Sequence, residues 1–303
     1  MKKAVYDYNK IKPATNVLFH IILAALALAC VIPLILVISI SFSPESAIRE
    51  YGYTLFPRDW TLEGYQFLFR QRALILRAFG MSVFVTVVGT LLGGLLTTLM
   101  GYVLSRREFM ANKFLMWLVF IPMIFNGGLV STFFIVGQFL QLRDTAWALI
   151  LPLAVSSFNV IVCRTFFRLT IPDELLESAK IDGAGQFTIF FRLVMPLSLP
   201  LLATIGLFLS FAYWNDWFQA LLYIDNQALF TLQAFLNQLL ADINALAQNA
   251  QRLGLTQAQL LATMPREAAR MAIVVVVVLP ILCTYPFFQR YFISGLTLGA
   301  IKG

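Results

Sequence analysis

The residues whose side chains are best suited to a chemical role form a short polar stretch between two long apolar segments. Residues 177–183 read Glu-Ser-Ala-Lys-Ile-Asp-Gly, and Pro196 follows after the segment 184–195. Charged residues make up 12% of the chain and hydrophobic residues 60%. The charged and hydroxyl side chains of this stretch can form ion pairs and hydrogen bonds. We therefore expect water to reach it on one side of a membrane, where it can be held against a partner.

A helix is predicted over residues 171–182. Thr170 precedes a turn that contains Pro172, Asp173 and Glu174. The N–H groups of a first helical turn have no partners within the helix, and the helix dipole favours carboxylates there, so we expect Thr170 to cap this helix. Twelve or so residues span roughly 18 Å at about 1.5 Å per residue. Such a helix is too short to cross a bilayer and suits a lever that lies along its surface.

A sharp turn and a second helix are predicted to follow. Gly183 and Gly185 can adopt backbone angles that other residues avoid. Residues 186–194 can then form a helix that we expect to stop before Pro196, because proline interrupts helical hydrogen bonding.

Long uncharged runs indicate a membrane protein. Residues 81–104 and 114–142 contain no charged residue, and each run is long enough to cross a hydrocarbon layer of ~30 Å. The net charge of +7 comes from basic residues spread along loops, a distribution that argues against a nucleic-acid surface. No metal site is predicted, because the single histidine and the three cysteines have no metal-ligand spacing.

The predicted fold is all-α, a polytopic membrane protein with six transmembrane helices and both termini in the cytoplasm. Three basic residues in the loop 105–113, against one in 138–145, place the first loop on the cytoplasmic side. The predicted spans are about 17–42, 78–104, 114–137, 145–163, 197–218 and 268–288. The other parts are a cytoplasmic N-terminal segment (1–16) and, within a transmembrane domain (17–303), a cytoplasmic loop (164–196), an outer segment (225–267) and a cytoplasmic tail (289–303).

Three further patterns bear on packing. Gly89, Gly93 and Gly94 let neighbouring helices approach closely, so the second span should lie at the centre of the bundle. The Asn-Gly-Gly break at 126–128 is tolerated at membrane depth where protein or a wet cavity satisfies the backbone. In the outer segment, apolar residues recur at helical spacing between 232 and 246. This stripe indicates either packing on the outer face of the bundle or a docking role.

The polar stretch resembles the cytoplasmic coupling loop, also called the EAA loop, of ABC-importer permeases. The pattern of that loop is Glu-Ala-Ala, three residues, Gly, nine residues, then Ile-any-Leu-Pro. The positions that agree are Glu177, Ala179, Gly183 and Pro196. Ser178, Leu193 and Met195 replace residues of similar size or polarity.

A larger part of the chain resembles the maltose-type sugar importers, and within them the permeases for complex oligo- and polysaccharides. The segments that carry this likeness are 125–129, 145–152, 164–167, 214–218 and 295–303. The resemblance implies one permease subunit of an ATP-driven importer in the bacterial cytoplasmic (inner) membrane. Its implied partners are a second permease subunit, a cytoplasmic ATPase dimer, an extracytoplasmic solute-binding protein, the carbohydrate substrate and membrane lipid.

The resemblance also implies how energy reaches this chain. The sequence has no Walker loop of the type GxxxxGK[ST], so we expect no enzyme activity and no cofactor in this chain by itself, with ATP and Mg²⁺ bound by the partner ATPase. Helix 171–182 would be the contact, with Glu177 paired to a basic residue in a groove of the ATPase. The implied coupling residues are Glu177, Ser178, Ala179, Asp182, Gly183 and Pro196. The alternative is that Glu177 is a solvated charge on an amphipathic helix.

Candidate residues for the solute path surround an unusual carboxylate. Asp216 lies deep in an apolar run, where ionisable groups usually face a bundle interior or a water pathway. The candidates are Asn126, Tyr213, Trp214, Asn215, Asp216 and Trp217, whose flat faces and polar tips suit sugar rings. The alternative is an interfacial aromatic belt.

The nature of the solute stays open at this point. An acidic glycan such as alginate is compatible with the arginines predicted on the outer side, which are Arg49, Arg58, Arg70, Arg72 and Arg77. Arginines near a bilayer edge more often contact lipid phosphate, which is the favoured alternative. A different class of function, an ion-coupled secondary transporter of a small polar solute, would use Asp216 as its coupling group.

Overall fold

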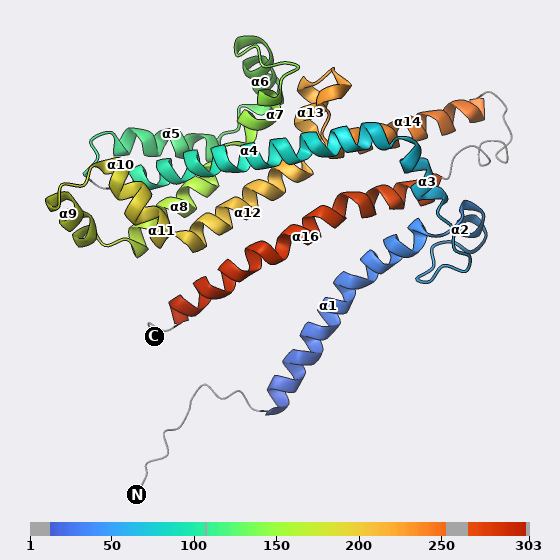
Figure 1. Ribbon diagram of the computed structural model, residues 1–303, viewed down its shortest axis with the longest axis horizontal. Helices are drawn as coiled ribbons and strands as arrows, with labels where there is room; N and C mark the ends of the chain where they lie inside the picture. Colours follow the sequence, from blue (N-terminus) through green and yellow to red (C-terminus); the bar gives the residue numbers. More distant parts are fainter. Residues whose placement is uncertain (1–12, 107, 253–265, 301–303) are drawn as a thin grey trace, which may run out of the picture. The chain divides into compact units, whose positions relative to one another are not determined.

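The computed structural model describes residues 13–106, 108–252 and 266–300, and over these residues every regular element is a helix (Figure 1). The basic residues at positions 2–12 and the ends of the predicted outer segment and tail, at 253–265 and 301–303, lie outside the described residues. The chain divides into two compact units. The first comprises residues 1–70 and 246–276, and the second comprises 71–245 and 277–303.

The first unit begins with the long apolar helix α1 (Pro13–Ser41). Most of its large side chains are exposed, as expected of a helix that lies in lipid. Two short helices follow, α2 (Glu45–Tyr51) and α3 (Glu63–Arg70). Gly64 of α3 lies so close to α16 (Arg266–Ala300) that a Cβ on it would be 2.7 Å from the carbonyl oxygen of Ala268.

The second unit is built on α4 (Arg72–Ser105), which packs along α8 (Ser157–Thr170) and α12 (Leu199–Asn215). Apart from the helices of the polar stretch, which are described below, the other elements here are α5 (Asn112–Ile124), α6 (Gly128–Phe134), the π-helix η1 (Ile135–Phe139), α7 (Ala146–Ile150), the 3₁₀-helix η2 (Leu151–Leu153), α13 (Phe218–Tyr223), the 3₁₀-helix η4 (Gln227–Leu229) and most of α14 (Leu232–Arg252). The helix α14 confirms the helical spacing seen between 232 and 246.

Close backbone approaches hold α4 in place. An added Cβ would lie 2.5 Å from the ring of Tyr213 at Gly89 and 2.6 Å from the Ala154 carbonyl at Gly93. These two contacts confirm the predicted packing. At Gly94 nothing lies within 4 Å, so the prediction is wrong for that residue, which points away from both neighbours. Sequence reasoning missed Gly101, where a Cβ would be 2.4 Å from the Cβ of Cys163.

The predicted spans correspond to helices of several kinds. Within the described ranges, α1, α4 and the part of α16 at 267–284 are long and apolar enough to cross a membrane. Two further candidates are bent pairs, 146–153 with 157–170 at 50° and 186–197 with 199–215 at 85°. The remaining candidate, predicted at 114–137, is divided into α5 and α6 at the Asn-Gly-Gly break.

Two helices extend beyond the predicted ends of their spans. The helix α8 continues from the expected boundary at 163 to Thr170, and α16 continues from 288 to Ala300. The predicted spans ended before Arg164 and Gln289, the polar residues that end the apolar runs. The helices continue through both residues because arginine and glutamine have good helix propensity.

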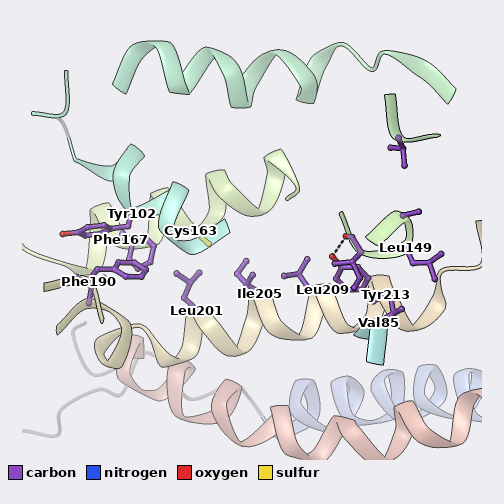
Figure 2. Close-up of a cluster of buried hydrophobic side chains, with 14 of the residues drawn as sticks. Val85, Tyr102, Leu149, Cys163, Phe167, Phe190, Leu201, Ile205, Leu209 and Tyr213 are labelled. Atoms are coloured by element: carbon purple, nitrogen blue, oxygen red, sulfur yellow. Dashed lines mark hydrogen bonds between the residues drawn. The ribbon is translucent and has the colours of Figure 1, made fainter. Parts of the chain in front are cut away.

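The core of the second unit runs along α12. Leu201, Ile205 and Leu209 point from this helix into a cluster of buried apolar side chains, with Tyr102, Phe167 and Phe190 at one end and Tyr213 at the other (Figure 2). The residues around the candidate polar stretch are therefore packed into the same core as the apolar helices.

Candidate functional site

The polar stretch forms a short helical hairpin. Its first helix, α9 (Asp173–Ile181), begins after Pro172, whereas Thr170 is the last residue of α8. The prediction that Thr170 caps this helix is therefore wrong, and so is its start at 171. The reason is that the residue before a proline is driven out of the helical region, so the chain leaves one helix at Ile171 and starts the next after Pro172.

The turn at the end of α9 depends on one glycine. Gly183 has φ +82°, and its N–H donates to the carbonyl of Lys180 at 3.0 Å. This left-handed conformation is the one in which glycine is favoured. Gly185 has φ −71°, which any residue can adopt, so it is not part of the requirement.

The return arm of the hairpin is helical through its proline. It consists of α10 (Gln186–Thr188), the π-helix η3 (Ile189–Val194) and α11 (Met195–Leu197). The prediction that the helix stops before Pro196 is wrong, because Pro196 lies in the first turn of α11, where a missing N–H is tolerated. The chain then bends by 85° into α12. The return arm of the hairpin therefore runs nearly perpendicular to the apolar helix that follows it.

One face of α9 is buried and the other is exposed. Leu176 is 4% exposed within the core cluster, and Ala179 packs against the same cluster. The side chains of Glu177 and Ser178 are exposed. Exposed as well are the predicted coupling residues Asp182, Gly183 and Pro196. The structure therefore brings the predicted coupling residues together on one hairpin, and all of them except Ala179 are accessible to a partner.

Large apolar side chains accompany these polar residues at the hairpin surface. Ile181 is 85% exposed and Phe187 is 76% exposed. Beside them lies a hollow of about 440 Å³ between the end of α4 and the hairpin, lined among others by Tyr102, Arg106 and Lys180. Exposed apolar groups at the ends of a polar helix are typical of a protein contact surface.

Sequence reasoning missed the ion pair that attaches this hairpin to α4. The Nη1 atom of Arg106, just after α4, lies 2.8 Å from the Oδ1 atom of Asp173, the first residue of α9. The two residues are far apart in sequence, so their spacing gives no signal. The only available signal is a basic residue directly after an apolar span.

Two of the proposed solute-path residues are committed to packing within the second unit. Tyr213 is 1% exposed, and its hydroxyl donates to the carbonyl of Ile150 at 2.8 Å. Trp214 is 7% exposed, and its indole N–H donates to the carbonyl of Val277 at 3.2 Å. Trp214 also contributes to the wall of an apolar cavity of about 300 Å³, together with Thr86, Thr90 and other residues.

The other four candidates are more accessible. Asn215 and Trp217 are exposed, and Asp216 is half-buried at the end of α12, where its carboxylate accepts the N–H of Gln219 at 3.3 Å. Asn126 is exposed at the break between α5 and α6, and its Oδ1 accepts the N–H of Gly128 at 2.9 Å. Contact of any of these residues with a solute stays a prediction.

The described residues contain no group of three or more His, Cys, Asp or Glu side chains that could hold a metal ion. Cys163 is a free, buried thiol that packs against Gly101, which is a structural role. The chemistry available to the hairpin is therefore that of ion pairs, hydrogen bonds and apolar contacts.

The apolar helices and the exposed hairpin together define a polytopic, all-helical membrane protein. The sequence model of the family described as "Binding-protein-dependent transport system inner membrane component" matches residues 93–297. The chain belongs to this family of ABC transporter permeases, which confirms the resemblance found in the sequence.

Individual relatives match over nearly the whole chain. The chain is 39% identical over 288 residues to the polygalacturonan/rhamnogalacturonan transport system permease protein YtcP of Bacillus subtilis (strain 168), which covers 95% of this chain and 98% of that protein. It is 32% identical over 299 residues to the arabinooligosaccharides transport system permease protein AraQ of Halalkalibacterium halodurans, with 97% and 99% covered.

The fold also matches a solved structure. One chain of the crystal structure of a bacterial ABC transporter involved in the import of the acidic polysaccharide alginate superposes with a TM-score of 0.78 and 25% identity. The match covers 93% of this chain and 99% of that chain. The similarity therefore extends well beyond the hairpin.

Proposed function

We propose that this chain is one of two permease subunits of an importer that takes up oligo- or polysaccharide and is driven by a cytoplasmic ATPase dimer. The observation that carries this proposal is the hairpin. Its helix α9 buries Leu176 in the core of the second unit and exposes Glu177 and Ser178 on the opposite side. A helix that is fixed on one face and polar on the other is suited to transmit the movement of a partner.

The membrane arrangement forms part of the proposal. Six spans result when α1, α4 and α16 are combined with the two bent pairs and with the divided helix α5 and α6. Both termini and the coupling loop at 164–196 then lie in the cytoplasm. In this topology the segment 225–267 faces outward, where an extracytoplasmic solute-binding protein delivers the carbohydrate.

The proposed mechanism assigns a task to each part of this chain. ATP and Mg²⁺ bind to the partner ATPases, and this chain binds no cofactor itself. Glu177 pairs with a basic residue of the ATPase, and Gly183 allows the sharp turn that presents α9. Closure of the ATPase dimer then moves the hairpins of the two permeases, and the bundle changes between two packed states.

The solute path would run past the accessible residues Asn126, Asn215 and Trp217, with Asp216 at its edge. An acidic glycan is one proposed substrate, because the structural neighbour imports alginate and the relative YtcP has a name that refers to polygalacturonan. Tyr213 and Trp214 would shape this path through packing, since their polar atoms already have partners within the protein.

The ion-coupled alternative depended on Asp216 as an intramembrane carboxylate. That carboxylate accepts the backbone N–H of Gln219 in the first turn of α13 at 3.3 Å, so it already has a partner within the protein. We therefore do not propose ion coupling. Uptake driven by a proton or sodium gradient without ATP would contradict this choice.

The proposal can be tested with Glu177→Ala in the transporter reconstituted with its copurified partners. The expected result is continued ATP hydrolysis with a loss of uptake, because the contact that connects the two processes is removed. The matched control is Glu174→Ala, which removes another exposed carboxylate from the same helix. Normal uptake by the Glu177 variant, or purification of the chain without an ATPase, would contradict the proposal.

A further inference from the structure

We propose that Arg106 and Tyr102 form a clamp that fixes the coupling hairpin to the end of α4, so that a displacement of α9 moves α4 directly. We call these two residues the α4 clamp. The inference rests on the proposed function and adds positioning residues that lie outside the coupling loop.

The first half of the clamp is a preorganised arginine. The guanidinium of Arg106 pairs with Asp173 at 2.8 Å, while its Nε–H donates to the hydroxyl of Ser105 at 2.9 Å. The same group lies 5.4 Å from the centre of the Tyr102 ring. Its side chain is 18% exposed, although that of Asp173 is 81% exposed. An exposed ion pair usually contributes little because both side chains must be ordered, but here two other contacts already order the arginine.

The second half of the clamp is the ring of Tyr102, which contacts one aromatic residue before the hairpin and another on its return arm. Tyr102 is 7% exposed and packs edge-to-face against Phe167 with ring centres 5.9 Å apart. The ring centre of Phe190 lies 5.3 Å from that of Tyr102. Phe167 is in α8, before the hairpin, and Phe190 is in η3, on the return arm (Figure 2). A single ring of α4 therefore contacts the chain on entry to and exit from the hairpin.

These contacts explain why a push on α9 would reach α4. Asp173 is the first residue of α9, and the ion pair therefore holds the helix at the end where it leaves the bundle. Without this attachment, the start of α9 would be connected to the bundle only through the link at Ile171 and Pro172 and the buried side chain of Leu176. Directly before Tyr102 in α4, Gly101 approaches Cys163 of α8 closely. This contact connects α4 to α8, so the displacement would be passed on to the helices of the core.

The test measures solute uptake per ATP hydrolysed in proteoliposomes that contain the complete transporter. We compare Arg106→Ala, Asp173→Ala and the exchanged pair, Arg106→Asp with Asp173→Arg. Each single variant is expected to lower the ratio about fivefold, the effect of losing roughly one ion pair of this strength. The exchanged pair should recover part of the loss. Full recovery is not expected, because an arginine at the first position of α9 opposes the helix dipole.

Two further variants keep the test decisive. Arg106→Lys retains the charge and lacks the Nε–H that bonds Ser105, so its ratio should lie between those of the wild type and Arg106→Ala; it also serves if the alanine variant does not insert. Arg143→Ala is the matched control. It breaks an ion pair of similar length, with Asp225 at 2.9 Å, in a loop away from the hairpin, and should leave the ratio unchanged.

The outcomes separate this inference from the function on which it rests. If the single variants keep the wild-type ratio while Glu177→Ala uncouples the transporter, the α4 clamp is wrong and the coupling helix stands. An exchanged pair as uncoupled as the single variants also overturns the clamp. If Glu177→Ala and the clamp variants all retain normal coupling, the proposed function itself fails.

Discussion

The hydroxyl of Tyr213 donates a hydrogen bond of 2.8 Å to the carbonyl of Ile150, which connects α12 to the point where α7 ends. Both residues are buried, at 1% exposed each. The ring of Tyr213 also occupies the space that a side chain on Gly89 of α4 would need. Three elements of the second unit therefore meet at one tyrosine.

Removing this hydroxyl separates packing from solute binding at Tyr213. Tyr213→Phe keeps the ring and leaves the Ile150 carbonyl unpaired, so we expect a loss of about 1–3 kcal/mol in the free energy of unfolding. Thermal unfolding of the purified protein in detergent measures the change. An unchanged unfolding temperature together with weaker uptake would instead place the hydroxyl in the solute path.

The close approach of α4 and α8 predicts that alanine has opposite effects on stability at two glycines of α4. Gly101→Ala places a Cβ 2.4 Å from that of Cys163 and should destabilise the protein by about 1–3 kcal/mol through overpacking. Gly94→Ala meets nothing within 4 Å and should be neutral or stabilising by up to about 1 kcal/mol, the usual preference for alanine in a helix.

A second substitution provides the control for this comparison. Cys163→Gly removes the Cβ that Gly101→Ala would strike, so the double variant should be less destabilised than the sum of the two single variants. Additive unfolding free energies in the double-mutant cycle would contradict a direct clash.

The turn after α9 predicts a similar contrast within the hairpin. Gly183→Ala forces a Cβ into the left-handed conformation at φ +82° and should cost about 1–2 kcal/mol. Gly185→Ala, at φ −71° with open space around it, should have no such cost. Uptake is expected to fall in the first variant and to persist in the second. Equal uptake by both variants would show that transport does not require this turn.

The carboxylate of Asp144 predicts a dependence of stability on pH. It accepts the backbone N–H groups of Asn226 at 2.9 Å and Asp225 at 2.7 Å. These bonds lower the pKa of the Asp144 carboxyl below its ordinary value of about 3.9. A lowered folded-state pKa stabilises the protein at pH above about 3.9, and this contribution is lost as the pH falls through the lowered value.

Thermal unfolding of Asp144→Asn tests this dependence. The variant should unfold at a lower temperature than the wild type at neutral pH, and the difference should shrink under strongly acidic conditions, where both side chains are uncharged. Asp242→Asn is the control, because that carboxylate bonds a side chain within its own helix, Gln238. A difference that does not change with pH would contradict the role of the charge.

The sequence was sufficient for features that depend on residue type along the chain. The apolar runs, the break at 126–128 and the turn at Gly183 follow from local composition, and the structure contains each of them. The predicted coupling residues were chosen by their spacing, and the structure places them on one hairpin, while their role in coupling stays a prediction. The family resemblance was also carried by local patterns.

Features that depend on distant neighbours were not predictable in the same way. Arg106 gives no indication of Asp173, since the two meet only after α4, α5 and α8 have packed. Gly94 and Gly101 are both glycines of α4, and only the position of α8 decides which of them needs to be glycine. The helix continues through Pro196 because this residue lies in the first turn of α11, and no sequence pattern indicated where that turn or the π-helix before it begins.

The spacing of the tight glycine contacts has a mechanical consequence. Gly89, Gly93 and Gly101 each lie against a different neighbour, namely the Tyr213 ring, the Ala154 carbonyl and Cys163. A shift of α4 along its axis by one residue, about 1.5 Å, would therefore bring larger side chains of α4 against these groups at several points at once. Sliding of α4 past its neighbours is therefore blocked. If the hairpin moves as proposed, we expect α4 to tilt or rotate together with α8 and α12, because the close contacts at Gly101 and Gly89 keep the three helices in register.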